Sequence, residues 1–494
     1  MSQLFRHPRL TSIALIVTPS LLLLLVFAAV HTLPFLHQQQ LTYALPPPLP
    51  NDLRPPFQLS SDLYSNKTSQ HQTEVEPGTF SYGSTIVTAF QVGRFSDGGS
   101  SNIGWATSTD GGNTWKNGFL PGTTQFAGGP FTRVSDPSVA YDAAYKTWII
   151  SSLAVTGSGA SLASPAVIVN LSTDGGLSWS KPIDVVNGGS TYYDKDWITC
   201  DSTATSKFYG HCYIEWDDDN KGGLIEMSTS TNGGRSWETP ITTDNKAHGL
   251  GGQPLVQPNG TVIVPISGYD TSRILSFIST DGGASWSKTS VVAKITGSVL
   301  PTAAMDGSGK VYLVWVDCQF EANCKPGGAS DESADRSEND NSDTSLSGSE
   351  DDLVMSTSTD GIHWSPVQLI PIDSRGSGID HLVPGLGVDK NTSGNNAHLA
   401  LAFYYHSTTC DTGNCQFYAG FVSSDDGGNH WTKKIQLARP MNLSWLPQGR
   451  NKVGDYISTS FVDGNAFPVF SIAFAPSNGH LSEAMYTITG GLEV

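Results

Sequence analysis

The sequence predicts an all-β protein with very little helix. Its 494 residues include 52 Gly and 12 Trp. Many short runs of β-branched or aromatic residues are separated by Gly, Asn, Asp and Ser, which is typical of strands joined by tight turns. Because all-β domains often reach this length as single units, one large domain fits the chain.

An octet that occurs six times divides the chain into similar parts. Five copies fit S-x-D/N-x-G-x-x-W, and the copy that starts at Ser358 is one residue shorter. The intervals between copies run from 49 to 79 residues, the size of a four-stranded unit with its loops. The copies occupy residues 108–115, 172–179, 230–237, 279–286, 358–364 and 424–431.

The chemistry of the octet is that of a tight turn. Its Ser and Asp can bond to backbone amides of the turn, its Gly residues take positive φ, and its Trp anchors the returning strand. The octets resemble the Asp-box, or bacterial neuraminidase repeat, found between the third and fourth strands of propeller blades in sialidases and related proteins. The resemblance implies a single β-propeller over residues 57–494, with seven four-stranded blades and six as the alternative.

The seventh blade is expected to be incomplete in the C-terminal sequence. Three further strand-like runs follow the last octet without a box of their own, in residues 456–464, 466–475 and 483–490. The segment 57–63 near the N-terminus could supply the missing outer strand, which would close the ring and remove an exposed sheet edge.

The N-terminus is predicted to be an export segment. Arg6 and Arg9 precede an uncharged stretch, residues 11–40, whose apolar core at 13–36 is long enough to cross a bilayer. Residues 1–43 are therefore expected to be a signal peptide or membrane anchor, and the proline-rich residues 44–56 a stiff spacer. The remainder would lie outside the cytoplasm, secreted or attached to the membrane through this segment.

The six cysteines agree with export. They fall into three close pairs, Cys200 with Cys212, Cys318 with Cys324, and Cys410 with Cys415. Close pairing in an exported chain predicts local disulfides, with six reduced thiols as the alternative.

The charge distribution argues against nucleic-acid binding. The net charge is −18, and residues 329–352 contribute −8 of it, which leaves −10 for the rest of the chain. The acidic stretch is predicted to be a disordered insert because it has almost no apolar side chains to bury. No cofactor is expected, although calcium at the acidic run 216–220 is possible.

A ring of polar residues is expected at the centre of the propeller. The residues just before each innermost strand should converge at one face of the channel, and several acids there would perturb one another's pKa. Asp136, Asp196 and Asp455 are the strongest catalytic candidates; capping of strand ends is the alternative for each acid. The ring also contains Glu74, Glu76, Asp194, Lys195, Gln253, Asp380, His381 and Tyr456.

The resemblance to sialidases implies further site residues. In that family three arginines bind the substrate carboxylate, an Asp is the acid/base catalyst, and a Tyr paired with Glu is the nucleophile. By position, Asp97 resembles the catalytic Asp, Tyr456 the nucleophile, and Glu215 or Glu226 its partner. Arg94, Arg273 and Arg450 (or Arg439) resemble the arginines. Where the family has Arg-Ile-Pro, however, this chain has Val75-Glu76-Pro77, which places a carboxylate where a carboxylate would bind.

Two kinds of function follow. One is a sialidase-like, exported, glycan-active protein, a glycoside hydrolase acting at the channel mouth, with Arg94, Arg273, Arg450, Glu76, Gln253 and His381 as substrate-binding candidates. The other is a non-catalytic surface propeller that binds glycans or proteins. In either case the expected partner is a glycan or glycoconjugate, and the chain is expected to be a monomer.

Overall fold

The structure is a computed structural model, and it describes residues 54–296, 300–322, 324, 350–409, 415–447 and 453–494. Contacts divide the chain into two units, Met1–Pro46 and Pro47–Val494. The first unit, with the predicted export segment, lies outside the described residues, as does most of the acidic insert. All the described strands and turns belong to the second unit.

The described residues are almost entirely strand and turn, which confirms the all-β prediction. Their helical segments are single 3-10 turns: η1 (Gln125–Ala127), η2 (Gly159–Ser161), η3 (Asp219–Lys221), η5 (Gly394–Asn396) and η6 (Leu443–Trp445). None of the helices in the described ranges is long and apolar enough to span a bilayer.

The strands form consecutive antiparallel groups. The first group is β2 (Gln70–Tyr82), β3 (Thr85–Arg94), β4 (Ser100–Ser108) and β5 (Lys116–Phe119). The second is β6 (Arg133–Asp142), β7 (Thr147–Thr156), β8 (Ala163–Ser172) and β9 (Ile183–Asn187). The third is β10 (Tyr193–Cys200), β11 (Cys212–Asp218), β12 (Leu224–Ser230) and β13 (Ile241–Thr242).

The remaining groups repeat this order. The fourth is β14 (Gly249–Leu250), β15 (Leu255–Val256), β16 (Val262–Gly268), β17 (Arg273–Ser279) and β18 (Ser290–Lys294). The fifth is β19 (Thr302–Met305), β20 (Val311–Asp317), β21 (Asp352–Ser358) and β22 (Gln368–Leu369). The sixth is β23 (Ile379–Val388), β24 (Leu399–Ser407), β25 (Gln416–Ser424), β26 (Ile435–Gln436) and β27 (Met441–Asn442). The last is β28 (Ser458–Val462), β29 (Asn465–Ala473), β30 (Glu483–Ile488) and β31 (Leu492–Glu493).

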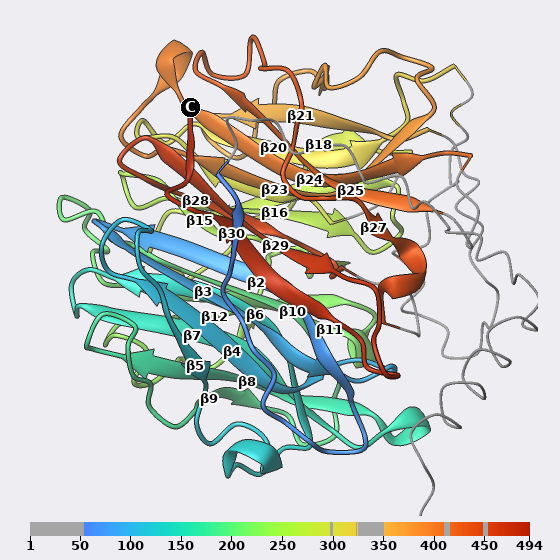
Figure 1. Cartoon of the computed structure of the whole chain (residues 1–494). Coiled ribbons are helices and arrows are strands. Elements are labelled where there is room, and N and C mark those ends of the chain that lie inside the picture. The colour runs from blue at the N-terminus through green and yellow to red at the C-terminus, as the bar shows by residue number, and fades with distance from the viewer. Residues whose placement is uncertain (1–53, 297–299, 323, 325–349, 410–414, 448–452) are drawn as a thin grey trace, which may run out of the picture. The chain divides into compact units, whose positions relative to one another are not determined.

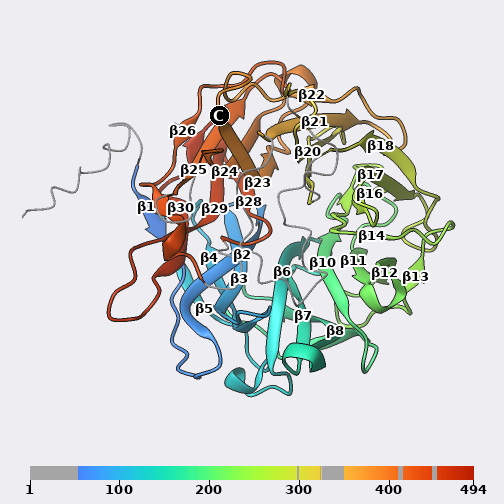
Figure 2. The same ribbon diagram turned by 90° about the vertical axis from the view of Figure 1, so that its right-hand side faces the viewer.

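By hydrogen bonding these groups make six sheets, because the first two share one eight-stranded sheet. That connection rests on a single residue pair, Ser100 with Val134. Within this unit the groups follow one another in chain order around a common centre (Figures 1 and 2).

The two ends of the described chain meet. The hydroxyls of Thr79 on β2 and Ser460 on β28 lie 3.1 Å apart, and Ser81 donates to the carbonyl of Phe461 at 2.7 Å. The short strand β1 (Pro56–Gln58) pairs antiparallel with β30 and becomes the outer strand of the last sheet. The prediction that the segment near Phe57 supplies this strand is confirmed.

The core lies between neighbouring groups. Val87 of β3 and Trp148 of β7 belong to one buried cluster, and Val167 of β8 and Trp216 of β11 belong to the next. Each group of strands therefore buries its faces against the neighbouring groups, and polar residues are left for the inner edge.

The octets form the turns that their sequence predicts. In the second copy, Ser172 Oγ accepts from Gly176 N at 2.9 Å and donates to Asp174, whose carboxylate accepts from Ser178 N. The other copies repeat the Ser–Asp/Asn bond, and each octet follows the third long strand of its group.

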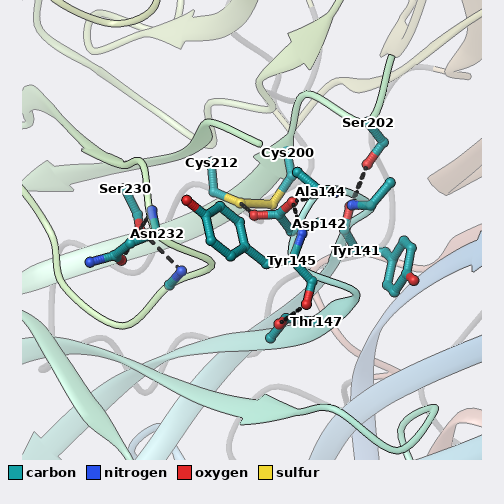
Figure 3. Close-up of a disulfide and its surroundings, with 12 residues drawn as sticks. Tyr141, Asp142, Ala144, Tyr145, Thr147, Cys200, Ser202, Cys212, Ser230 and Asn232 are labelled. Atoms are coloured by element: carbon teal, nitrogen blue, oxygen red, sulfur yellow. Dashed lines mark hydrogen bonds between the residues drawn. A yellow bond between two sulfur atoms is a disulfide. The ribbon is translucent and has the colours of Figure 1, made fainter. Parts of the chain in front are cut away.

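Two of the three predicted disulfides are described, Cys200–Cys212 and Cys318–Cys324. Cys415 is disulfide-bonded as well, and Cys410 lies outside the described residues. The first disulfide joins directly paired residues of β10 and β11. It packs beside the turn after β6, where Asp142 accepts from the amide of Ala144 (Figure 3).

Candidate functional site

Four of the inner strands carry the same distortion at the same place. The register of β2, β6, β10 and β23 against the next strand shifts by a β-bulge. At each bulge one non-glycine residue has a left-handed backbone: Glu76 (φ 58°), Asp136 (φ 48°), Lys195 (φ 50°) and Val383 (φ 49°). Such conformations cost about 1–3 kcal/mol each and concentrate at functional sites.

Residues at or next to three of these bulges, Asp136, Lys195 and Pro384, line a pocket. It is lined by residues of the second to sixth groups and of the segment before β28. Its polar and aromatic lining residues are Asp136, Lys195, Asp196, Trp197, Gln253, Thr302, Asp455 and Tyr456. The predicted convergence of polar residues thus occurs, but Asp136 and Lys195 lie within the inner strands. The predicted positions just before those strands were wrong, because the strands begin earlier than expected and the bulges redirect the side chains.

Lys195 is the charged centre of the pocket. Its Nζ lies 2.6 Å from Asp455 Oδ2 and 3.4 Å from Asp136 Oδ1, and all three side chains are at most 10% exposed. Burial lowers the pKa of the ammonium, but the charges of Asp136 and Asp455 outweigh it and hold the pKa well above its usual value.

Glu76 supports this arrangement from the side. Its carboxylate accepts from Gln91 Nε2 and, at 3.3 Å, from the backbone amide of Asp455. Gly454, beside it, has φ 108°, and a side chain there would collide with the Glu76 backbone nitrogen. The loop before β28 is therefore fitted closely against β2, so that Asp455 faces Lys195.

Asp196 differs from the other acids because it is buried at the pocket without a cation partner. Its side chain is 1% exposed, and neither oxygen has a hydrogen-bond partner of ordinary geometry in the described residues. Burial raises the pKa of Asp196 well above its usual value, the charges of Asp136 and Asp194 add to the rise, and the nearby Ser151 hydroxyl opposes it. Burial therefore favours the protonated form of this carboxyl.

Two more buried acids lie on β11, behind Asp196. Burial is the main cause that raises the pKa of Glu215 and of Asp217 well above the usual range. At Glu215 the charge of Asp196 raises the pKa further. Glu215 was predicted only as a tyrosine partner, and Asp217 only as part of the acidic run. Their spacing of two residues on one strand, which places both side chains on the same face, is the sequence signal for the pair.

Tyr456 and Trp197 form the aromatic wall of the pocket. Their ring centroids are 5.4 Å apart at 69°, an edge-to-face pair. The Tyr456 hydroxyl donates to the carbonyl of Pro137 at 3.4 Å. Burial raises the pKa of this phenol, and the charges of Asp136 and Glu76 raise it further, so the hydroxyl stays neutral.

Several predicted site residues lie elsewhere. Asp97 forms a bidentate ion pair with Arg133 at 2.6 and 3.1 Å and accepts from Gly159 N. His381 contacts the carbonyl of Asp351 and the carboxylate of Asp373, and it does not line the pocket. In β23 the bulge falls at Val383, and Pro384 occupies the place at the pocket that the sequence assigned to Asp380 and His381.

The arginines and Tyr456 do not share a pocket in the described residues. Arg94 ends β3 and is buried where its charge acts on Glu483 of β30. Arg273 is half exposed at the start of β17 and pairs with Asp270 at 3.0 Å. Arg450 lies outside the described residues. Lys195 is the one cation among the described residues that line the pocket.

The described side chains include no group of three His, Cys, Asp or Glu residues suited to a metal ion. In the acidic run 216–220, Asp218 instead pairs with Lys221 at 2.9 Å. Gln253, another predicted ligand-binding residue, does line the pocket, and its side-chain oxygen accepts from Ala303 N at 2.6 Å.

Comparison with known proteins supports the repeat assignment. A family described as a BNR repeat-like domain matches residues 163–350. The chain is thus similar to the Asp-box, sialidase-like superfamily, as the octets indicate. No curated protein matches the chain.

Solved structures with related shapes include glycan-processing enzymes. A leech intramolecular trans-sialidase is 13% identical over 70% of this chain and 67% of its own, with a TM-score of 0.44. An ulvan lyase of a new polysaccharide lyase family is 11% identical over 88% and 96%, with a TM-score of 0.48. NanB sialidase from Streptococcus pneumoniae is 16% identical over 90% and 71%, with a TM-score of 0.41. At these identities and TM-scores the likenesses say nothing about what this chain acts on.

Proposed function

We propose that residues 57–494 form one seven-bladed β-propeller, with the pocket at its centre. Support comes from the consecutive antiparallel groups of four or five strands, from the single residue pair that joins the first two, and from β1, the outer strand of the last sheet. We further propose that residues 1–43 export the chain or anchor it in a membrane, that 44–56 are a spacer, and that the propeller works outside the cytoplasm as a monomer. The disulfides support an oxidising compartment.

We infer that the chain is a glycan-active protein and that its pocket hydrolyses glycosidic bonds. The observation that carries this proposal is a buried carboxyl with a raised pKa, Asp196, in the same pocket as the two carboxylates that pair with Lys195, Asp136 and Asp455. Acid/base hydrolysis of glycosides needs one carboxyl that keeps its proton and a second carboxyl as the base, and burial favours the protonated form at Asp196.

In this mechanism Asp196 donates its proton to the glycosidic oxygen as the bond to the anomeric carbon breaks. A water molecule attacks that carbon, and Asp136 or Asp455 accepts a proton from the water. Lys195 keeps these carboxylates in place, and Trp197 with Tyr456 provides aromatic surface for the sugar ring.

The test is hydrolysis of a panel of fluorogenic glycosides, including a sialoside, by the full chain. Asp196→Asn should lower kcat by a factor of about 10²–10⁴. The control is Asp244→Asn, which changes an exposed acid remote from the pocket, and it should leave turnover unchanged. Undiminished turnover by Asp196→Asn would contradict the assigned role. Sialoside turnover that Tyr456→Phe abolishes would instead support sialidase chemistry.

The second candidate is a non-catalytic propeller that binds glycans or proteins. It is favoured by the ion pairs of Lys195 with Asp136 and Asp455, because these three side chains already have charged partners without a substrate. A folded chain that binds glycans but turns over none of the panel would establish this alternative.

A further inference from the structure

The charges of the pocket carry an inference about the sugar that it accepts. Asp136 and Asp455 both contact Lys195, and Glu76 contacts the backbone of Asp455. Among the described lining residues, the carboxylates of Asp136 and Asp455 thus stand against one ammonium, with no other cation beside them.

Lys195 is already engaged by its own neighbours. Its Nζ lies within 3.4 Å of both aspartates, and the side chain is 10% exposed. The carboxylate of a uronic or sialic acid would have to displace one aspartate from Lys195 while lying close to the other. Two negative charges at a buried site repel each other more strongly than they do in bulk water. An incoming ammonium would instead be attracted to the carboxylates of Asp136 and Asp455.

The aromatic wall favours the same kind of ligand. Trp197 and Tyr456 are both partly exposed at the pocket, beside the carboxylates. A sugar ring can stack on such rings, and an ammonium is attracted both to an aromatic face and to a carboxylate. Asp196 adds a buried acid at the same place, whose oxygens have no hydrogen-bond partner of ordinary geometry in the described residues.

We propose that this pocket selects glycans that contain hexosamine units with a free amine, over N-acetylated units and over glycans that carry carboxylates. The inference rests on the proposed glycan-active pocket and names its substrate class. Asp455 and Asp136 are the residues that set this specificity, since either carboxylate can pair with a substrate ammonium while the other keeps Lys195.

The experiment measures binding and turnover separately. The full chain is titrated calorimetrically with glucosamine, N-acetylglucosamine and galacturonic acid oligomers of equal length, at about pH 5, where the glucosamine amines are protonated. Glucosamine oligomers should bind at least about tenfold tighter than either other series. That preference should shrink as salt is raised, because salt screens ion pairs.

Matched variants separate charge from folding. Asp455→Asn and Asp136→Asn should each reduce the preference for the amine about tenfold, while Asp244→Asn should retain it. If either pocket variant fails to fold, the salt dependence of the unaltered chain still decides. Equal binding of the three series, tighter binding of galacturonate, or no binding to any of them would overturn the inference.

Turnover of the same oligomers distinguishes this inference from the proposal on which it rests. Amine-selective binding without hydrolysis supports the selectivity and removes the hydrolase. Hydrolysis without preference for the amine keeps the hydrolase and overturns the selectivity.

Discussion

The chain is expected to lose stability as the pH rises from 5 to 8.5, and the substitution Glu74→Gln should make this loss smaller. Glu74 lies on β2 and contacts Ser60, which follows the short strand β1, and the residue is 1% exposed. Ser60 Oγ donates to its carboxyl at 2.9 Å and accepts from Met485 N at 2.8 Å. Burial raises the pKa of Glu74 from 4.5 to about 8, the Ser60 hydrogen bond lowers it, and the charge of Asp62 adds to the rise.

The size and sign of the effect follow from this pKa. Between pH 4.5 and about 8 the unfolded chain has lost the proton that the folded chain keeps. Stability therefore falls by about 1.4 kcal/mol per pH unit in that window, by roughly 5 kcal/mol at most. The stability that the protonated Glu74 contributes is fully present below pH 4.5 and is lost as the pH rises towards 8. Above pH 8 it changes no further.

The assay is urea unfolding of the unaltered chain and of Glu74→Gln at pH 5 and pH 8.5. The variant should lose less stability between the two values, although buried Glu483, whose pKa is also raised, leaves part of the decline. Glu238→Gln, which changes an exposed acid, is the control and should match the unaltered chain. An equal decline in all three proteins would refute the argument.

Three further predictions concern the turns, the cross-link and the pocket. Ser172→Ala leaves the buried amide of Gly176 without its acceptor and should cost about 1–3 kcal/mol in urea unfolding, whereas Thr173→Ala next to it should cost little. Replacing Cys200 and Cys212 by Ser opens the cross-link between two core strands and should lower stability by about 2–5 kcal/mol; an unchanged midpoint would show that the bond adds nothing. Lys195→Met leaves buried carboxylates facing each other and should destabilise the fold by about 3–5 kcal/mol near pH 7, with partial recovery at acidic pH; a loss that does not depend on pH would contradict this origin.

The sequence was sufficient for the repeated architecture because each octet is a local device. The hydrogen bonds of Ser172 and Asp174 all lie within one octet, so short-range sequence determines them. The outer strand near Phe57 was also predictable, since the last group lacked one strand. Both inferences use spacing and turn chemistry, which a single sequence contains.

The pocket was only partly predictable because its geometry depends on bulges. In three of the four bulged strands a proline follows the left-handed residue, as in Glu76-Pro77, Asp136-Pro137 and Val383-Pro384. The third bulge has Asp196 after Lys195, so proline alone does not mark the position. The sequence alone does not show the bulge in β23. Counting residues along that strand without the bulge placed His381 at the pocket, where Pro384 lies instead. Arg94 and Arg273 lie away from the pocket for another reason: sequence order does not show which end of a strand a side chain occupies. The prediction for Arg450 is untested, because this residue lies outside the described residues.

The contrast between the turns and the pocket supports a functional role for the pocket. In the first octet the Ser108 and Asp110 side chains find hydrogen-bond partners within four residues, which is what a folding device requires. At the pocket, the left-handed residues are strained and the Asp196 and Glu215 carboxyl oxygens are buried without hydrogen bonds of ordinary geometry. Each of these features lowers stability, and strand capping needs none of them. Local violations of folding rules that recur at equivalent positions of several strands, around one pocket, are what a site maintained for binding or catalysis would show.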